Sequence, residues 1–475
     1  MQQRRALVPS SAPSSASSSA PSSAPTPALI LALILALILA LTLALILALT
    51  SALATAAGPA PTADQPLPGA QAQPPAMPSR PPIVIAHRGA SAYRPEHTLA
   101  AYQLAIEQGA DFIEPDLVPT RDGVLVARHE NALSDTTDVA ARKDFADRRT
   151  TKTIDGEPVT DWFTEDFTLA ELAALRTRER IPDIRPANSA FDGHFGIPTL
   201  AEIIQLVRDA ERDTGRRVGI YPEIKHPTYF RHTGRHLDGR PIGMDLGAML
   251  VAELRRLDFT DPARVYIQSF EPASLLALKR ETLPQHGLAI PLVQLIGDVT
   301  NRFVNAGGGG FSRPFDLVYH ARNGDDLDAI YGMQLASVIR RGGGWEAGYG
   351  ALASAEGAAA IAGYADAIGP WKLLIFPRRQ LPDPADGDDD GRAEITQQLT
   401  GEQTPLVRMA HAAGLAVHPY TLRPEEPFLA LSAAGAPQSF RDELTQLLAA
   451  GVDGLFSDDP AAARAAVRAH QATAP

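Results

Sequence analysis

The 475-residue chain contains no cysteine. This absence excludes disulfide bonds, thiolate zinc sites, iron–sulfur clusters and a cysteine nucleophile. Lysine is scarce too, with five lysines among 43 basic residues. The formal net charge is −12, so the chain lacks the basic excess that is typical of nucleic-acid-binding proteins. We therefore expect no nucleic-acid partner.

Charged residues are absent between Ala6 and Ala63. Within this segment, residues 27–53 repeat Leu-Ile-Leu-Ala units, a run long enough to cross a bilayer as a helix. The small residues that follow, Ser51 to Ala57, are typical of a signal-peptidase site. The segment thus predicts export to the periplasm or the extracellular space.

Two interpretations of this segment remain open, a cleaved signal sequence and an uncleaved anchor. Only the anchor would bring the protein to a membrane. A third interpretation, a buried core helix, is disfavoured, because the repeat has no polar face. The expected parts are a signal sequence or anchor at 1–57, a Pro/Ala-rich linker at 58–80 and an α/β domain at 81–471.

From Ile83 onward, short apolar runs alternate with helical patterns, which is typical of a parallel sheet with crossover helices. Helical patterns include Thr98–Gln108, Leu200–Asp213 and Ala248–Leu257. Nine runs are predicted to be strands: Ile83–His87, Asp111–Asp116, Val124–His129, Val218–Lys225, Arg264–Phe270, Leu288–Leu295, Tyr364–Ile368, Leu415–Tyr420 and Val452–Ser457.

The second and third runs are too close together for a crossover helix, so they should form a hairpin. Asp122-Gly123 is a favoured two-residue turn, and that turn would place Asp116 opposite His129. The other strands then number eight, which predicts a (β/α)8 TIM barrel with a hairpin excursion after the second strand. The longest insertions are 131–195 and 300–350.

In such barrels, catalytic residues lie at the carboxyl ends of the strands. Carboxylates at i and i+2, such as Glu114 and Asp116, share one face of a strand. The chemistry-bearing residues at the first strand ends are His87, Arg88, Glu114, Asp116, His129, Glu223 and Lys225.

Each of these residue types has a use in phosphodiester chemistry. Three carboxylates without cysteine suit a hard divalent cation, Ca²⁺ or Mg²⁺. Arg88 and Lys225 could neutralise a phosphate, and two histidines could serve as general base and general acid. Each signal alone has a structural alternative, such as a surface ion pair. Their convergence on consecutive strand ends predicts a phosphodiesterase site.

Several motifs are similar to those of the glycerophosphodiester phosphodiesterase family, and most to its larger periplasmic bacterial members. The similarity extends over about residues 80–470. The motifs are His87-Arg-Gly-Ala-Ser91, Pro95-Glu-His-Thr-Leu99, Gly109 to Leu117 with Thr120 to Gly123 and His129, Asp135 to Val139, Ile197 to Leu200, Glu223-Ile-Lys225, Gln268-Ser-Phe270, His418-Pro-Tyr-Thr421 and Gly451 to Asp458.

The resemblance implies a role for each matching residue. Glu114, Asp116 and Glu223 would hold a divalent ion, Ca²⁺ in the periplasmic type. His87 and His129 would be the acid/base pair, and Arg88 and Lys225 would bind the phosphate. The implied reaction splits glycerophosphodiesters, such as glycerophosphocholine and glycerophosphoethanolamine, into glycerol 3-phosphate and an alcohol.

Other residues are candidates for supporting positions. Glu96 is expected to support the mouth by hydrogen bonding, and Pro115, which lacks a ladder donor, should break its strand. Residues 386–391 imitate the start of a calcium loop, but Gln397 replaces the closing Glu, which favours a solvated acidic turn over a cation site. The remaining candidates for a supporting contact or a pocket wall are Gln268, Phe270, Tyr420 and Phe456.

Two further functions stay open from the sequence. One is a phospholipase C- or D-like phosphodiesterase that acts on membrane lipid from the same barrel. The other is a non-catalytic surface protein that binds glycerol phosphate. The sequence leaves the head group and the oligomeric state open.

Overall fold

A ring of parallel strands organises the part of the chain that the structure describes, residues 81–473 of a computed structural model. The predicted signal sequence or anchor lies outside these residues. The strands, in order around the ring, are β1 (Ile83–His87), β2 continued by β3 (Phe112–Glu114, Asp116–Pro119), β7 continued by β8 (Gly219–Ile220, Glu223–Ile224), β9 (Ile267–Ser269), β10 (Leu292–Ile296), β11 (Ala367–Pro370), β14 (Ala416–Val417) and β15 (Gly454–Ser457).

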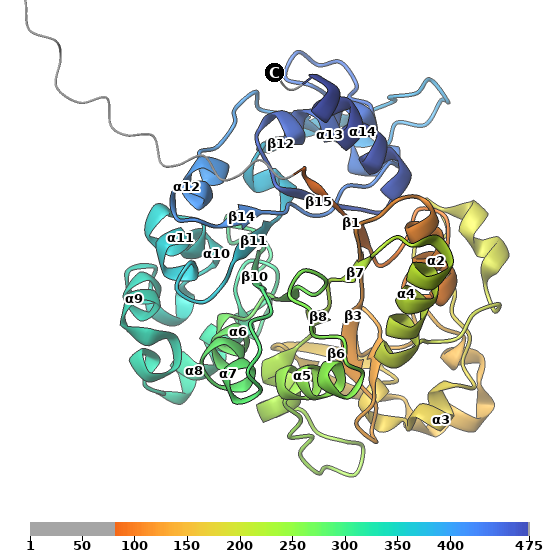
Figure 1. Cartoon of the computed structure of the whole chain (residues 1–475), viewed down its shortest axis with the longest axis vertical. Coiled ribbons are helices and arrows are strands. Elements are labelled where there is room, and N and C mark those ends of the chain that lie inside the picture. The colour runs from red at the N-terminus through yellow and green to blue at the C-terminus, as the bar shows by residue number, and fades with distance from the viewer. Residues whose placement is uncertain (1–80, 474–475) are drawn as a thin grey trace, which may run out of the picture. The chain divides into compact units, whose positions relative to one another are not determined.

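The ring closes on both sides of the last strand. β15 pairs in parallel with β1. On its other side, Asp453 N donates to Val417 O over 2.9 Å, and Leu422 N donates to Phe456 O over 2.9 Å. The predicted (β/α)8 barrel is confirmed, with helices surrounding the strands (Figure 1).

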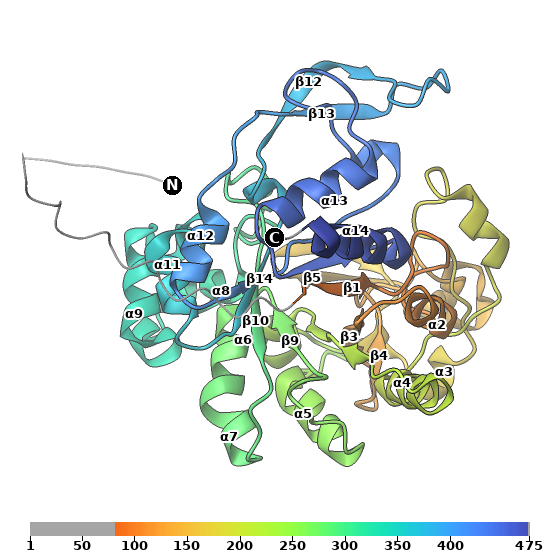
Figure 2. The same ribbon diagram turned by 45° about the horizontal axis from the view of Figure 1, so that its top comes forward.

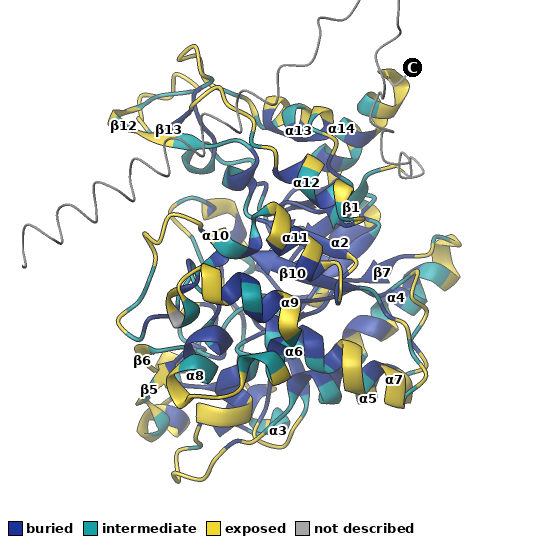
Figure 3. Ribbon diagram, turned by 90° about the vertical axis from the view of Figure 1, so that its left-hand side faces the viewer, coloured by how far each residue is buried: buried dark blue, intermediate teal, exposed yellow. Residues whose placement is uncertain are grey.

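Helices cover the outside of the barrel, so the barrel strands are buried while the helices expose their outer faces (Figure 3). Helix α4 shows why: Thr199 caps its first turn by accepting from Glu202 N, and apolar residues at i, i+3, i+4 and i+7 face the strands. The helices are α2 (Leu99–Glu107), α3 (Leu169–Leu172), α4 (Leu200–Thr214), α5 (Leu246–Arg256), α6 (Pro272–Ala277), α7 (Leu283–Gln285), α8 (Phe315–Asn323), α9 (Leu327–Arg341), α10 (Tyr349–Leu352), α11 (Ala355–Ile361), α12 (Leu406–Ala412), α13 (Phe440–Ala449) and α14 (Pro460–Thr473). None of the described helices is both long and apolar enough to span a membrane.

Three hairpins depart from the simple barrel. β4 (Leu125–Ala127) pairs antiparallel with β3, and β5 (Thr150–Ile154) pairs with β6 (Glu157–Asp161) inside the first long insertion. β12 (Arg378–Ala385) and β13 (Ile395–Leu399) project beyond the barrel between β11 and β14 (Figure 2).

The predicted break at Pro115 is present. This proline lies between β2 and β3 and belongs to neither. Before this proline in the chain, β2 pairs with β1. After it, β3 no longer pairs with β1 and pairs with β4 instead. The missing N–H of Pro115 therefore lies where the second strand changes partners.

The expected hairpin register was wrong by one residue. The loop has three residues, because Thr120 N donates to Val124 O and Gly123 takes a positive φ of 79°, the geometry of a three-residue turn with a bulge. Arg128, not His129, therefore lies opposite Asp116, and Arg128 N donates to Asp116 O over 3.0 Å.

Candidate active site

The strand pleat explains which side chains reach the mouth of the barrel. Ile85, Phe112, Tyr221 and Phe456 belong to one buried cluster inside the barrel. Because residues at i and i+2 share a face of a strand, the residue two positions later in each strand lies above this floor. Those four residues are His87, Glu114, Glu223 and Asp458, and all are buried.

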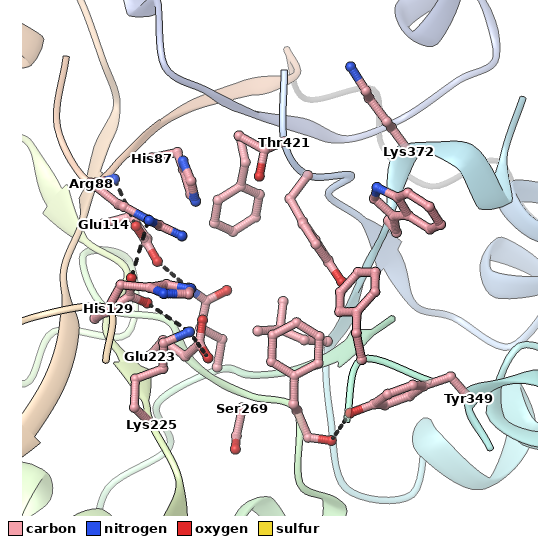
Figure 4. Close-up of a pocket in the computed structure, with 18 of the residues that line it drawn as sticks. His87, Arg88, Glu114, His129, Glu223, Lys225, Ser269, Tyr349, Lys372 and Thr421 are labelled. Atoms are coloured by element: carbon pink, nitrogen blue, oxygen red, sulfur yellow. Dashed lines mark hydrogen bonds and ion pairs between the residues drawn. The ribbon is translucent and has the colours of Figure 1, made fainter. Parts of the chain in front are cut away.

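A cavity of about 680 Å³ opens above this floor. Its polar wall contains all seven residues that the sequence singled out at the strand ends, and Figure 4 shows six of them gathered on one side of the pocket. The seven are His87, Arg88, Glu114, Asp116, His129, Glu223 and Lys225.

Three carboxylates meet at the centre of the polar wall. Glu114, Asp116 and Glu223 each offer an oxygen, and these oxygens lie within 4.8 Å of one another. Burial, together with the charges of Asp116 and Glu223, raises the pKa of Glu114 well above its usual value, and burial raises the pKa of Glu223 to about 7. Oδ1 of the buried Asp116 accepts no hydrogen bond from the described residues. A divalent cation would offset the repulsion between these three carboxylates, so the cluster fits a metal ion that prefers oxygen ligands.

The carboxylates are held by neighbours that fix their orientation. Arg88 N donates to Glu114 Oε2 over 2.8 Å, and Gln268 Nε2 donates to Glu114 Oε1 over 2.9 Å. His97 Nε2 lies 2.8 Å from Asp116 Oδ2. Sequence reasoning missed His97 as a functional residue, although it stands in a motif that was recognised.

Two cations accompany the carboxylates. Lys225 Nζ lies 2.8 Å from Glu223 Oε1, and Arg88 Nε lies 3.5 Å from Asp116 Oδ2. Burial lowers the pKa of Lys225, but the charges of Asp116 and Glu223 raise it further, so the net pKa lies above its usual value. As predicted, Glu96 forms a hydrogen bond at the mouth, because it accepts from Arg88 Nη1.

The backbone after β1 makes a tight turn that aims Arg88 at the cavity. Arg88 has a φ of 59° and Gly89 a φ of 91°. A Cβ on Gly89 would lie 2.7 Å from the backbone of Ala101, so only glycine fits this position.

Asp458, the residue directly after β15, lies behind His87. His87 Nδ1 lies 2.6 Å from Asp458 Oδ1. Burial raises the pKa of Asp458, but the charges of Arg185 and His87 bring it well below its usual value. An ionised carboxylate can only accept, so Nδ1 of His87 carries the proton. Burial lowers the pKa of His87 to about 4, which leaves Nε2 of the neutral ring as a proton acceptor.

His129 has a similar partner in Glu130, whose carboxylate pairs with His129 Nδ1. Burial, and then the charge of Arg88, lowers the pKa of His129 to about 3. Sequence reasoning identified both histidines but neither carboxylate. Asp458 could have been found, because it directly follows the last strand, two residues after the floor residue Phe456.

The opposite wall of the cavity is aromatic. Ring centroids of Phe270 and Tyr420 lie 5.8 Å apart, and those of Phe311 and Trp371 lie 5.3 Å apart. The hydroxyl of Tyr349, which Figure 4 labels on this side of the pocket, donates to Phe270 O. Of the predicted wall residues, Phe270, Tyr420, Phe456 and Gln268 all line the cavity.

The acidic turn at 386–391 lies outside this cavity. Asp386 accepts from Asp389 N and Gly391 N, and Asp390 accepts from Arg392 N. Although Asp386, Asp388 and Asp390 lie close enough together to hold an ion, these bonds within the turn account for their placement.

Comparison with known proteins bears on this site directly. Residues 87–307 and 389–462 match the model of the glycerophosphoryl diester phosphodiesterase family. The chain belongs to this family. The matched region begins at His87 and contains all seven residues of the polar wall, so the family shows the enzyme to be a phosphoric diester hydrolase.

Similar proteins come from distant organisms. A glycerophosphodiester phosphodiesterase of Arabidopsis thaliana is 31% identical over 385 residues, which cover 79% of this chain and 83% of that relative. One from Haemophilus influenzae is 29% identical over 80% of this chain and 87% of its own length. Among solved structures, a glycerophosphoryl diester phosphodiesterase from Silicibacter pomeroyi is 19% identical, covers 82% of this chain and 95% of its own, and has a TM-score of 0.46.

Proposed function

We propose that the protein is an exported, Ca²⁺-dependent glycerophosphodiester phosphodiesterase that releases glycerol 3-phosphate and an alcohol. Substrates such as glycerophosphocholine and glycerophosphoethanolamine fit this proposal. The observation that carries it is the meeting of three carboxylates, two cations and two carboxylate-held histidines on one wall of a single cavity.

The metal would be held by Glu114, Asp116 and Glu223. When bound, it would polarise a phosphoryl oxygen and offset the developing charge. Their carboxylate oxygens favour Ca²⁺, with Mg²⁺ as the alternative.

This chain's own groups would do the rest of the chemistry. Arg88 and Lys225 bind the phosphate. One neutral histidine accepts a proton at Nε2 from the attacking hydroxyl, either the glycerol 2-hydroxyl or water. The other histidine takes up a proton from solvent before this step and donates it to the leaving alcohol oxygen. If the 2-hydroxyl attacks first, water then opens the cyclic phosphate. The aromatic wall is placed to accept the leaving alcohol.

The products give a direct test of this function. We expect glycerophosphocholine to yield glycerol 3-phosphate and choline, detected by an enzymatic assay for glycerol 3-phosphate and by ³¹P NMR. Lysophosphatidylcholine and phosphatidylinositol are the matched lipid substrates. Faster turnover of the lipids would replace the proposal with a phospholipase. Binding of glycerol phosphate without turnover of any substrate would support a non-catalytic surface protein.

Export is tested on the protein isolated from cells. We expect the intact mass to show cleavage near Ala54–Ala57, because small residues follow the apolar run there. A full-length mass in the membrane fraction would indicate an anchor. A full-length mass in the soluble fraction would contradict export.

A further inference from the structure

The first long insertion, residues 131–195, contributes two arginines that contact the carboxylates behind the histidines. Arg180 and Arg185 both lie between α3 and α4, far from the strand ends in sequence. Neither lines the main cavity. Each nevertheless binds the carboxylate that pairs with one histidine.

Arg180 joins two carboxylates at once. Its Nη2 donates to Glu130 Oε2 over 2.7 Å and to Glu96 Oε1 over 2.7 Å, and its Nε donates to Glu96 Oε2 over 2.8 Å. Glu130 pairs with His129, and Glu96 accepts from Arg88. One guanidinium therefore supports both a histidine and the proposed phosphate-binding arginine.

Arg185 makes the corresponding contact for the other histidine. Its Nη2 donates to Asp458 Oδ2 over 2.6 Å, its Nε donates to Glu425 Oε1 over 2.5 Å, and its Nη1 donates to Ser91 O over 2.8 Å. Asp458 offers its remaining oxygen to His87. Arg423 approaches Asp458 as well, at 3.2 Å, so Arg185 is the closer of two cations there.

The loop that carries Arg180 and Arg185 is held together by hydrogen bonds between its own residues. Glu179 accepts from Ile181 N and from Asn188 Nδ2, while Glu179 N donates to Asp192 Oδ1 over 2.7 Å. Glu179 and Asn188 are buried. These bonds hold Arg180 and Arg185 in one rigid segment.

We propose that Arg180 and Arg185 are positioning residues, through which the insertion sets the orientation of His129 and His87. The proposal rests on the hydrolytic function proposed above. Arg180 binds Glu130 by two N–H groups, Nη1 to Oε1 over 3.1 Å and Nη2 to Oε2 over 2.7 Å, which fixes the plane of that carboxylate. Arg185 donates one N–H group to Asp458 and is itself held in place by Glu425. Each carboxylate then orients its histidine ring. A misplacement of about 1 Å at a reacting group can cost about 100-fold in rate.

The test is a pair of crossed double-mutant cycles. Arg180→Met and Arg185→Met should each lower kcat, by about 10- to 100-fold. Combined with Glu130→Gln, Arg180→Met should cost less than it does alone, and the remaining cost is the part that acts through Glu96 and Arg88. Combined with Asp458→Asn, Arg180→Met should cost its full factor. Arg185→Met should cost less in combination with Asp458→Asn than alone, and it should cost its full factor in combination with Glu130→Gln. Additive losses in all four combinations would overturn the proposal, because a merely structural role has no reason to follow the pairing.

Arg178→Met is the matched control. Arg178 belongs to the same loop, but its side chain donates only to the backbone oxygens of Ser134 and Asp135, so kcat should stay within about twofold. An equal loss in this variant would also count against positioning.

A second measurement separates this proposal from the proposed function. Nδ1–H of His129 should give a low-field proton resonance that shifts upfield in Arg180→Met and stays unchanged in Arg185→Met. That result holds even if the wild-type enzyme hydrolyses no glycerophosphodiester. A resonance that is unchanged in Arg180→Met would overturn positioning. Should Arg180→Met fail to fold, because the buried Glu96 and the half-buried Glu130 lose a shared partner, Arg180→Lys keeps the charge without the fork and should show the same pattern in weaker form.

Discussion

Replacing His129 by alanine is expected to lower kcat by about 10²- to 10⁴-fold, the usual contribution of a general acid or base. The barrel should remain folded, because the side chain of His129 faces a cavity and removing it breaks no strand pairing. Replacing His87 should cost a similar factor. The measurement is steady-state hydrolysis of glycerophosphocholine, with circular dichroism as the check on folding.

A substrate with a nitrophenolate leaving group assigns the two roles. Nitrophenolate needs no proton to leave, so the variant that lacks the general acid should recover most of its rate on this substrate. The variant that lacks the general base should not recover. Equal recovery of both variants, or of neither, would contradict a division of labour between His87 and His129.

His411→Ala provides a control for this pair of variants. His411 also pairs with a carboxylate, Asp453, at 2.8 Å, but it lies on α12 and does not line the cavity. Its replacement should leave kcat unchanged. A comparable loss in this variant would mean that losing any histidine–carboxylate pair impairs the enzyme.

Removal of the metal is expected to abolish turnover, and Asp116→Asn should do the same with the metal present. Asp116 is the proposed ligand whose buried Oδ1 accepts no hydrogen bond from the described residues. Treatment with EDTA, followed by titration with Ca²⁺ or Mg²⁺, measures both the dependence on metal and the preference between the two ions. Activity that survives EDTA at full rate would contradict metal dependence.

Thermal unfolding gives a readout that does not depend on activity. Ca²⁺ at about 100 times its dissociation constant should stabilise the wild-type protein by about 2.7 kcal/mol. It should not stabilise Asp116→Asn. Asp388→Asn in the exposed acidic turn is the matched control, and it should keep both the stabilisation and the activity. If Asp388→Asn lost the stabilisation instead, the cation would bind at the turn.

The barrel could be predicted because its signals are local. Each strand is a short apolar run, and β1 has the bounds that were expected, Ile83–His87. The hairpin register depended on one residue of loop length, which composition does not determine. Asp122-Gly123 was taken as the whole loop, whereas Arg121 also belongs to it.

The polar wall could be predicted because strand ends meet at one rim. The residues behind it were harder to find. Glu130 pairs with the residue next to it in sequence, and Arg180 reaches it from 50 residues away. Nothing in the composition of a long insertion distinguishes an arginine that supports a histidine from one that merely faces solvent. Contacts of that kind are fixed by tertiary packing.

The pairing of His87 with Asp458 joins residues 371 positions apart, one on the first barrel strand and one beyond the last. During synthesis, His87 is added early, and almost the entire chain must be made before Asp458 is added. A nascent or C-terminally truncated protein that stops before Asp458 would therefore contain the proposed metal ligands and both histidines, but His87 would lack the carboxylate that orients it. Under the proposed mechanism, turnover therefore requires the last strand to be in place.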